Sequence, residues 1–248
     1  MTGTHLQVYP TVSVLSKAAA DLFAQAARDA VDRRGRFLAA LSGGNTPIPL
    51  FKLLAGPPYQ DELPWTRMHF FWSDERCVPA DHPESNYGQA RGNWLARVPV
   101  LEGNLHRIKG ELEAGEAVKD YRERLEEYAE GGLGWPRLDF VLLGLGSDGH
   151  TASLFPGSEV NIDPQLAVVA VRGSYADRPA ERISLTPSVF NSARLVLFLV
   201  TGEEKAEALA ASRQGRSDPS RWPVQRIRPR DGKVLWLIDT AAASLLSR

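Results

Sequence analysis

Hydrophobic residues occur along this chain in short continuous runs that are separated by segments with helical spacing. The continuous runs predict strands that are covered on both faces, which is typical of a parallel sheet with helices above and below. The predicted strands are 6–9, 36–41, 68–72, 140–143, 166–171, 182–185, 194–200 and 234–239. Because they alternate with helical segments, we expect an α/β fold with one doubly wound, mostly parallel sheet in a single domain, residues 1–248.

The segments with helical spacing predict the helices that cover this sheet. They are residues 16–31, 50–54, 86–95, 113–130, 206–211 and 241–246. Gly35 should end the first helix, because glycine readily takes the left-handed conformation found just past helix C-termini. The segment 113–130 places Ala117, Tyr121 and Leu125 on one face and charged residues on the other, as an amphipathic surface helix does.

Glycine and polar residues follow four of the predicted strands. These segments are 42–47, 73–79, 144–157 and 201–205, and all four are expected to be loops or turns. In an open α/β sheet, ligands bind in the crevice beyond the carboxyl ends of the strands. We therefore expect the four segments to meet in one crevice.

The turn after the strand 140–143 carries the strongest candidate chemistry. Gly144, Gly146 and Gly149 allow positive φ angles and a close approach of the backbone to a ligand. The turn should therefore display Asp148 and His150 instead of packing them. Histidine is the natural general base near neutral pH, and Asp148 could fix its tautomer or hold a substrate hydroxyl.

Two other readings of this turn do not fit the sequence. The spacing of its glycines matches the dinucleotide-binding fingerprint, but that motif requires a long helix directly after the glycines. Pro156 prevents such a helix, and Asp163 lies in a turn-forming Asn-Ile-Asp-Pro segment instead of at a strand end. A nucleophile elbow is excluded because Leu145 stands where that motif needs a glycine two residues before Ser147.

Two further segments indicate recognition of an anion. Residues 42–47 combine free backbone N–H groups with the Ser42 and Thr46 hydroxyls at the start of a predicted helix, which would suit a phosphate group. An ordinary tight turn between strand and helix remains the alternative. Lys205 lies in the first turn of another predicted helix, where a cation opposes the helix dipole. An anionic ligand would explain its position.

Composition limits the possible partners. The 248 residues include 43% hydrophobic residues, and 29 basic residues balance 30 acidic ones to a net charge of −1. This balance gives no reason to expect nucleic acid as a partner. No apolar run approaches the ~20 residues of a membrane span, and the first residues do not form a signal peptide. We expect no membrane association, a cytoplasmic location and a small-molecule substrate. The oligomeric state stays open, with a monomer as the expectation.

Cysteine and histidine spacing argues against a metal site. Cys77 is the only cysteine, so the chain cannot form an internal disulfide or a cysteine-rich zinc site. The other histidines show no ligand spacing with His150 or Cys77. They are His5, His69, His82 and His106. We therefore expect no resident metal.

Five segments together resemble the 6-phosphogluconolactonase family, a member of the glucosamine-6-phosphate isomerase/6-phosphogluconolactonase superfamily. They are Ser-Gly-Gly-Asn-Thr-Pro at 42–47, Trp-Ser-Asp-Glu-Arg at 72–76, Gly-Leu-Gly-Ser-Asp-Gly-His-Thr-Ala-Ser-Leu-Phe-Pro at 144–156, Arg-Ile-Ser-Leu-Thr at 182–186 and Thr-Gly-Glu-Glu-Lys at 201–205. The match extends from about Leu6 to Ala243, and the long segment is its most specific part. The resemblance implies hydrolysis of 6-phospho-D-glucono-1,5-lactone to 6-phosphogluconate, in the oxidative pentose phosphate pathway, without a cofactor.

The resemblance also implies roles for individual residues. His150 would activate water, with Asp148 as its neighbour in the motif. The cations around the substrate would be Arg76, Arg182 and Lys205. The residues that contact the sugar phosphate or ring hydroxyls would be Ser42, Gly43, Gly44, Asn45, Thr46 and Asp74. The sequence does not assign which cation holds the phosphate and which faces the carbonyl.

Two alternative functions fit the same resemblance. Glucosamine-6-phosphate deaminases share the fold and the Asp-Gly-His turn, but their pattern has a glutamate where this chain has Phe155 and a tyrosine where it has Arg76. A non-enzymatic sugar-phosphate sensor is the second alternative, since the fold also occurs in transcriptional regulators. A regulator would require a DNA-binding segment, and no basic helix-turn-helix segment precedes Leu6.

Overall fold

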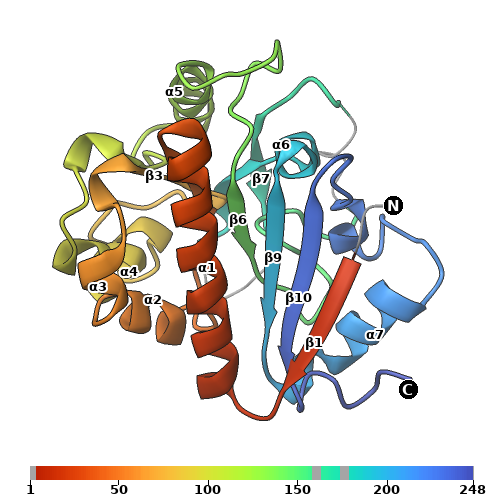
Figure 1. Ribbon diagram of the computed structural model, residues 1–248. Coiled ribbons are helices and arrows are strands. Elements are labelled where there is room, and N and C mark those ends of the chain that lie inside the picture. Colours follow the sequence, from red (N-terminus) through yellow and green to blue (C-terminus); the bar gives the residue numbers. More distant parts are fainter. Residues whose placement is uncertain (1–3, 158–162, 174–178, 248) are drawn as a thin grey trace.

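The computed structural model describes residues 4–157, 163–173 and 179–247, which form a large sheet, a small sheet and the helices around them (Figure 1). The large sheet has seven strands in the order β1-β10-β9-β6-β2-β3-β5, and every neighbouring pair is parallel. Its strands are β1 (Thr4–Tyr9), β2 (Phe37–Leu41), β3 (Met68–Trp72), β5 (Leu105–His106), β6 (Phe140–Leu143), β9 (Leu195–Val200) and β10 (Lys233–Asp239). The expectation of a doubly wound, mostly parallel sheet is confirmed.

Helices surround this sheet, and the long α1 lies across its face (Figure 1). The α-helices are α1 (Val12–Arg34), α2 (Ile48–Leu54), α3 (Tyr59–Glu62), α4 (Asn86–Asn93), α5 (Ala114–Glu126), α6 (Pro187–Ser192) and α7 (Ala206–Gln214). Short 3-10 helices are η1 (Trp65–Arg67), η2 (Leu95–Arg97), η3 (Glu102–Asn104), η5 (Glu203–Lys205) and η6 (Pro223–Arg226). No helix in the described residues is long and apolar enough to cross a membrane.

Packing of α1 on the sheet depends on aromatic side chains. Phe23 contacts Phe37 and Phe140 edge to face, with ring centroids 5.3 Å apart in both pairs. Such contacts stabilise a core beyond the burial of apolar area. At the end of α1, the N–H of Gly35 donates to the carbonyl of Val31 with φ of 74° at the glycine, as expected from the sequence. These contacts hold β2 and β6, which lead to two of the candidate loops.

A second sheet with three antiparallel strands was not anticipated from the sequence. It consists of β4 (Asp74–Arg76), β8 (Glu181–Leu185) and β7 (Val168–Arg172), in the order β4-β8-β7. The segment 73–79 was predicted to be a loop, but residues 74–76 pair with β8. Three consecutive charged residues do not resemble a strand, and they form one here because each of the three buried charges has polar partners.

The prediction of a C-terminal helix at 241–246 is wrong. Residues 240–245 form turns, and the N–H of Ala242 donates to the Asp239 carboxylate at 2.8 Å. Helix nucleation is unfavourable, so a segment this short needs tertiary packing of an apolar face to be stable. Leu245 is 60% exposed and supplies no such packing.

Two neighbouring histidines, the partly buried His69 on β3 and the buried His106 on β5, do not belong to the candidate site. His69 Nδ1 and His106 Nε2 lie 3.2 Å apart, and their rings are nearly parallel. Burial lowers the pKa of His106 to about 3, and the neighbouring His69 and Arg124 add to this shift. The unfolded chain binds a proton near pH 6.5 that the folded His106 does not accept, so acid should favour unfolding.

We expect the free energy of unfolding to fall by about 1–2 kcal/mol between pH 7 and pH 5 on account of His106 alone. Stability is lost as the pH drops below ~6.5, because the unfolded state then binds more protons than the folded state. Urea denaturation of His106→Gln, which cannot titrate, should show a shallower dependence on pH. His5→Gln changes an exposed histidine and is the matched control. Equal slopes for His106→Gln and the unmodified chain would contradict this account.

Candidate active site

The turn after β6 brings the candidate base to the carboxyl edge of the large sheet. The Gly146 N–H donates to the His150 carbonyl at 2.8 Å, and the Gly149 N–H donates to the Gly146 carbonyl at 3.0 Å. Gly149 has φ of 85°, in the left-handed region that glycine tolerates best. No helix follows, since residues 151–157 contain turns and a bridge between Thr151 and Leu154. This excludes the geometry of a dinucleotide fingerprint.

Gly146 is required by the close approach of the His150 ring. A Cβ atom at position 146 would lie 2.0 Å from His150 Nδ1 and 2.5 Å from Asp148 Oδ1. These distances are far below van der Waals contact, so any side chain there would displace the histidine. The glycine that the sequence reading assigned to ligand approach therefore makes room for the base and its carboxylate.

Asp148 and His150 form a hydrogen-bonded pair. Asp148 Oδ1 lies 2.5 Å from His150 Nδ1 and also accepts the His150 backbone N–H at 3.1 Å. A carboxylate next to Nδ1 favours the tautomer with the proton on Nδ1, which leaves the lone pair on Nε2. The side chain of His150 is 25% exposed. Such a histidine can accept a proton from a water molecule or a substrate.

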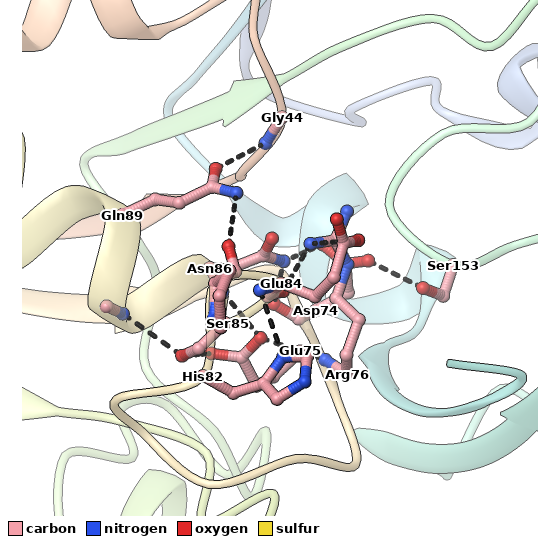
Figure 2. A network of polar contacts seen from close by, with 12 residues as sticks. Gly44, Asp74, Glu75, Arg76, His82, Glu84, Ser85, Asn86, Gln89 and Ser153 are labelled. Carbon is pink, nitrogen blue, oxygen red and sulfur yellow. Dashed lines mark hydrogen bonds and ion pairs between the residues drawn. The ribbon is translucent and has the colours of Figure 1, made fainter. Parts of the chain in front are cut away.

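The loop after β2 lies beside this pair. Its Ser42 hydroxyl donates to the Leu142 carbonyl at 2.8 Å and so joins β2 to β6. The Gly44 N–H donates to Gln89 Oε1 at 3.2 Å (Figure 2). A Cβ at Gly43 would lie 1.8 Å from Asn86 Oδ1, so this glycine allows α4 to approach the loop. In this structure the Ser42 hydroxyl thus has a structural partner.

Both predicted arginines lie on strands: Arg182 in a segment that was predicted to be a strand, and Arg76 in one that was predicted to be a loop. Arg76 on β4 is directly opposite Arg182 on β8 in the antiparallel register. They are only 6% and 4% exposed. Arg76 Nη1 donates to the Glu84 carbonyl and lies 3.6 Å from the Glu84 carboxylate. The Arg182 guanidinium lies over the Phe155 ring, 5.7 Å from its centroid.

Polar contacts from several segments fix Asp74, the residue at the start of β4 (Figure 2). Asp74 Oδ2 accepts the Ser153 hydroxyl at 2.5 Å, and Oδ1 accepts Asn86 Nδ2 at 3.2 Å. Tyr121 of α5 fixes the end of β3 just before it, because the Tyr121 hydroxyl accepts the N–H of Trp72 and donates to its carbonyl, both at 2.8 Å. The carboxylate of Asp74 is therefore held in one orientation at the cavity.

Glu75 has a structural role that the sequence did not reveal. Its buried carboxylate accepts the N–H groups of Asn86 at 2.7 Å and Tyr87 at 2.8 Å, at the N-terminus of α4. Burial raises the pKa of Glu75, while these hydrogen bonds act in the opposite direction. A carboxylate at a helix N-terminus is stabilising, so Glu75 attaches α4 to β4 beside the site.

Lys205 approaches from the opposite side, after β9. Gly202, earlier in the same segment, has φ of 97°. The N–H of Gly202 donates to both carboxylate oxygens of Asp239 at 3.2 Å. Within the described part of the chain, the Lys205 ammonium makes no hydrogen bond or ion pair. Its charge is available to an anionic ligand.

These segments enclose a cavity of about 350 Å³. Of the predicted residues, those that line it are Ser42, Gly43, Gly44, Asn45, Thr46, Asp74, Arg76, His150 and Lys205. Asp148 and Arg182 are not among its lining residues. Asp148 contacts His150, and Arg182 contacts Phe155, whose ring is 5.2 Å from that of His150. Both residues are therefore neighbours of the cavity.

Sequence reasoning missed several residues at this cavity. Asn86 and Glu204 line it, and Ser153 supports Asp74 from behind. The sequence carried one signal for Asn86, the Ser85 hydroxyl, which caps α4 by accepting the Gly88 N–H at 3.0 Å. Ala152 also lines the cavity and has φ of 48°, a strained value for a residue with a side chain. Such strain is concentrated at functional sites.

The described residues contain no group of three or more His, Cys, Asp or Glu side chains arranged to hold a metal ion. The cavity is lined by the carboxylates of Asp74 and Glu204 as well as by backbone N–H groups, an imidazole and two cations, and the cations suit an anionic organic ligand better than a metal.

Comparison with known proteins places this arrangement in a family. The model for glucosamine-6-phosphate isomerases/6-phosphogluconolactonase matches residues 10–236. The chain belongs to this family. A curated relative named 6-phosphogluconolactonase, from Nostoc sp., is 39% identical, and the match covers 98% of this chain and 98% of the relative. Another of that name, from Haemophilus influenzae, is 38% identical over 84% of this chain and 86% of its own.

Solved structures of the family have the same fold. The structure of 6-phosphogluconolactonase from Trypanosoma brucei superposes with a TM-score of 0.88 at 27% identity, over 100% of both chains. A monomeric glucosamine-6-phosphate deaminase superposes with a TM-score of 0.81 at 19% identity, over 97% of this chain and 99% of its own. At that identity the likeness shows the fold alone. The description of the matching family itself names both glucosamine-6-phosphate isomerases and 6-phosphogluconolactonase.

Proposed function

We propose that this chain hydrolyses 6-phospho-D-glucono-1,5-lactone to 6-phosphogluconate, without a cofactor, as a cytoplasmic enzyme of the oxidative pentose phosphate pathway. The observation that carries this choice is the environment of His150. Asp148 bonds its Nδ1 side, and the apolar Phe155 ring packs against it at 5.2 Å. The single cysteine, and therefore the absence of an internal disulfide, fits a cytoplasmic location.

His150 acts as the general base in this proposal. Nε2 takes a proton from water while the water oxygen forms a bond to the lactone carbonyl carbon C1. The tetrahedral intermediate then collapses, the bond between C1 and the ring oxygen breaks, and the imidazolium returns the proton to that oxygen. Asp148 keeps the Nδ1 proton in place and stabilises the imidazolium, as a carboxylate does in hydrolases with a histidine base.

The cations at the cavity divide between the phosphate of the substrate and the carbonyl oxygen, which becomes negative only in the transition state. Arg76 is held by Glu84 and lies on β4 beside Asp74, so we assign it to the oxyanion that develops on the carbonyl oxygen. Lys205 lacks an acidic partner in the described residues, so we assign it to the phosphate together with the loop 42–46. Binding of the remote phosphate positions C1 for attack and lowers the barrier.

Phe155 argues against the deaminase reaction. Ring opening and isomerisation of an amino sugar require a proton shuttle, which the deaminase pattern supplies with a glutamate at this position. Phenylalanine cannot transfer protons, and here its ring contacts His150 and Arg182 instead. Hydrolysis of a lactone needs one base and an oxyanion site, both of which the cavity can provide.

Purified protein should release acid from 6-phosphogluconolactone, measured in a pH-stat above the spontaneous rate, and no ammonia from glucosamine 6-phosphate in a coupled assay. Heat-denatured protein at the same concentration is the control for spontaneous hydrolysis. Ammonia release without acid production would replace the hydrolase proposal by the deaminase alternative.

A further inference from the structure

A second cavity, separate from the candidate active site, lies between the end of α7 and β10. Its volume is about 310 Å³, at the lower end of the ~300–1,000 Å³ of small-ligand sites. Its polar lining includes Ser212, Arg213, Ser217, Arg228 and Trp236. No Asp or Glu is among its described lining residues.

Three buried polar atoms on residues of this cavity have no hydrogen-bond partner in the described residues. They are Ser212 Oγ, Arg213 Nε and the indole Nε1 of Trp236, a residue that is only 4% exposed. Each of these groups can donate a hydrogen bond. A buried donor without a partner costs about 1–3 kcal/mol, and native structures contain few of them. All three atoms belong to residues that line this one cavity, so hydrogen-bond donors are concentrated in its walls.

Arg213 adds an uncompensated positive charge. Its guanidinium stacks on the Trp236 ring, 5.4 Å from the centroid, and makes no hydrogen bond or ion pair with described residues. Burial lowers the pKa of Arg213, and no neighbouring acid counteracts this. By contrast, the half-buried Arg34 and Arg194 share the Asp139 carboxylate at 2.8 and 3.2 Å. Water could satisfy the donors of Arg213 but would not neutralise its charge.

The donors around the cavity come from several directions. Arg213 and Ser212 belong to α7, and Trp236 belongs to β10. Between these two elements in the chain lie Ser217 and Arg228, whose hydroxyl and guanidinium groups are 3.4 Å apart. A tetrahedral oxyanion presents four acceptor atoms in different directions, whereas a carboxylate presents two in one plane. We propose that this cavity is a binding site for a phosphate group, either free or carried by a small monoester.

Titration of inorganic phosphate into ¹⁵N-labelled protein tests the proposal through the Trp236 indole N–H resonance. This resonance is assigned with Trp236→Phe, and sodium chloride at equal ionic strength is the blank. Glycerol 3-phosphate in a parallel titration distinguishes a monoester from free phosphate by its Kd. We expect a saturable change in the chemical shift of this resonance. The Kd should be at least about tenfold higher in Arg213→Met than in the unmodified protein, although methionine keeps most of the apolar stem over Trp236. Arg213→Lys keeps the charge and should lie between the two.

Arg221→Met is the matched control for this experiment. Arg221 also stacks on a tryptophan, 5.2 Å from the Trp222 ring centroid, but does not line the cavity. Its replacement should leave the Kd unchanged. If neither phosphate compound shifts the resonance beyond the blank, the cavity holds only water and the proposal is wrong. An equal shift in Arg213→Met would place binding elsewhere and would also overturn it. If Arg213→Met does not fold, Arg213→Lys and Ser212→Ala provide the comparison.

Discussion

Replacing His150 by alanine is expected to lower kcat for lactone hydrolysis by about 100- to 10,000-fold, with little change in KM. The reason is that the imidazole accepts a proton only as water attacks the carbonyl, so its contribution is confined to the transition state. The side chain is partly exposed at the cavity, and the bond between its Nδ1 and Asp148 favours the tautomer with the lone pair on Nε2. Initial rates must be corrected for spontaneous hydrolysis.

Two comparisons make this test specific. Imidazole added to His150→Ala should restore part of the lost rate, because it can occupy the space of the missing ring, which no merely structural effect would explain. His5→Ala, at an exposed position on β1, should keep the full rate. Turnover within a factor of about three in His150→Ala would remove His150 from the mechanism.

The pattern of hydrophobic residues was sufficient to predict the large sheet. Strands such as β6 and β9 are buried along nearly their whole length, and burial on both faces produces the continuous apolar runs that identified them. The loops after β2, β3, β6 and β9 meet at one edge because all four strands are parallel. The parallel topology of the sheet therefore accounts for much of what could be predicted about the location of the site.

The small sheet could not be predicted by the same reasoning. β4 consists of Asp74, Glu75 and Arg76, and its stability depends on partners that are distant in sequence. Ser153 donates to Asp74 across 79 positions, and Asn86 donates to Glu75 across 11. No local pattern records such pairs. The orientation of Arg182, which follows from its place opposite Arg76, was hidden for the same reason.

Replacing Lys205 by alanine is expected to lower kcat/KM for 6-phosphogluconolactone by about 10- to 150-fold, the range that corresponds to losing one hydrogen bond to a charged group. With gluconolactone, which lacks the phosphate, the same variant should lose less than about threefold. The difference follows from the position of Lys205, which lines the cavity and has no acidic partner among the described residues. A phosphate dianion would supply that partner.

The ratio of the two losses is what separates recognition of phosphate from a structural role. Lys205→Arg keeps a cation and should retain part of the preference for the phosphorylated lactone. Lys52→Ala is the matched control, because Lys52 is exposed on α2, directly after the loop 42–47, and does not line the cavity. Equal losses on both lactones in Lys205→Ala would mean that the lysine supports the fold of the η5 segment. The phosphate would then have to bind through the backbone N–H groups of the loop and Arg76.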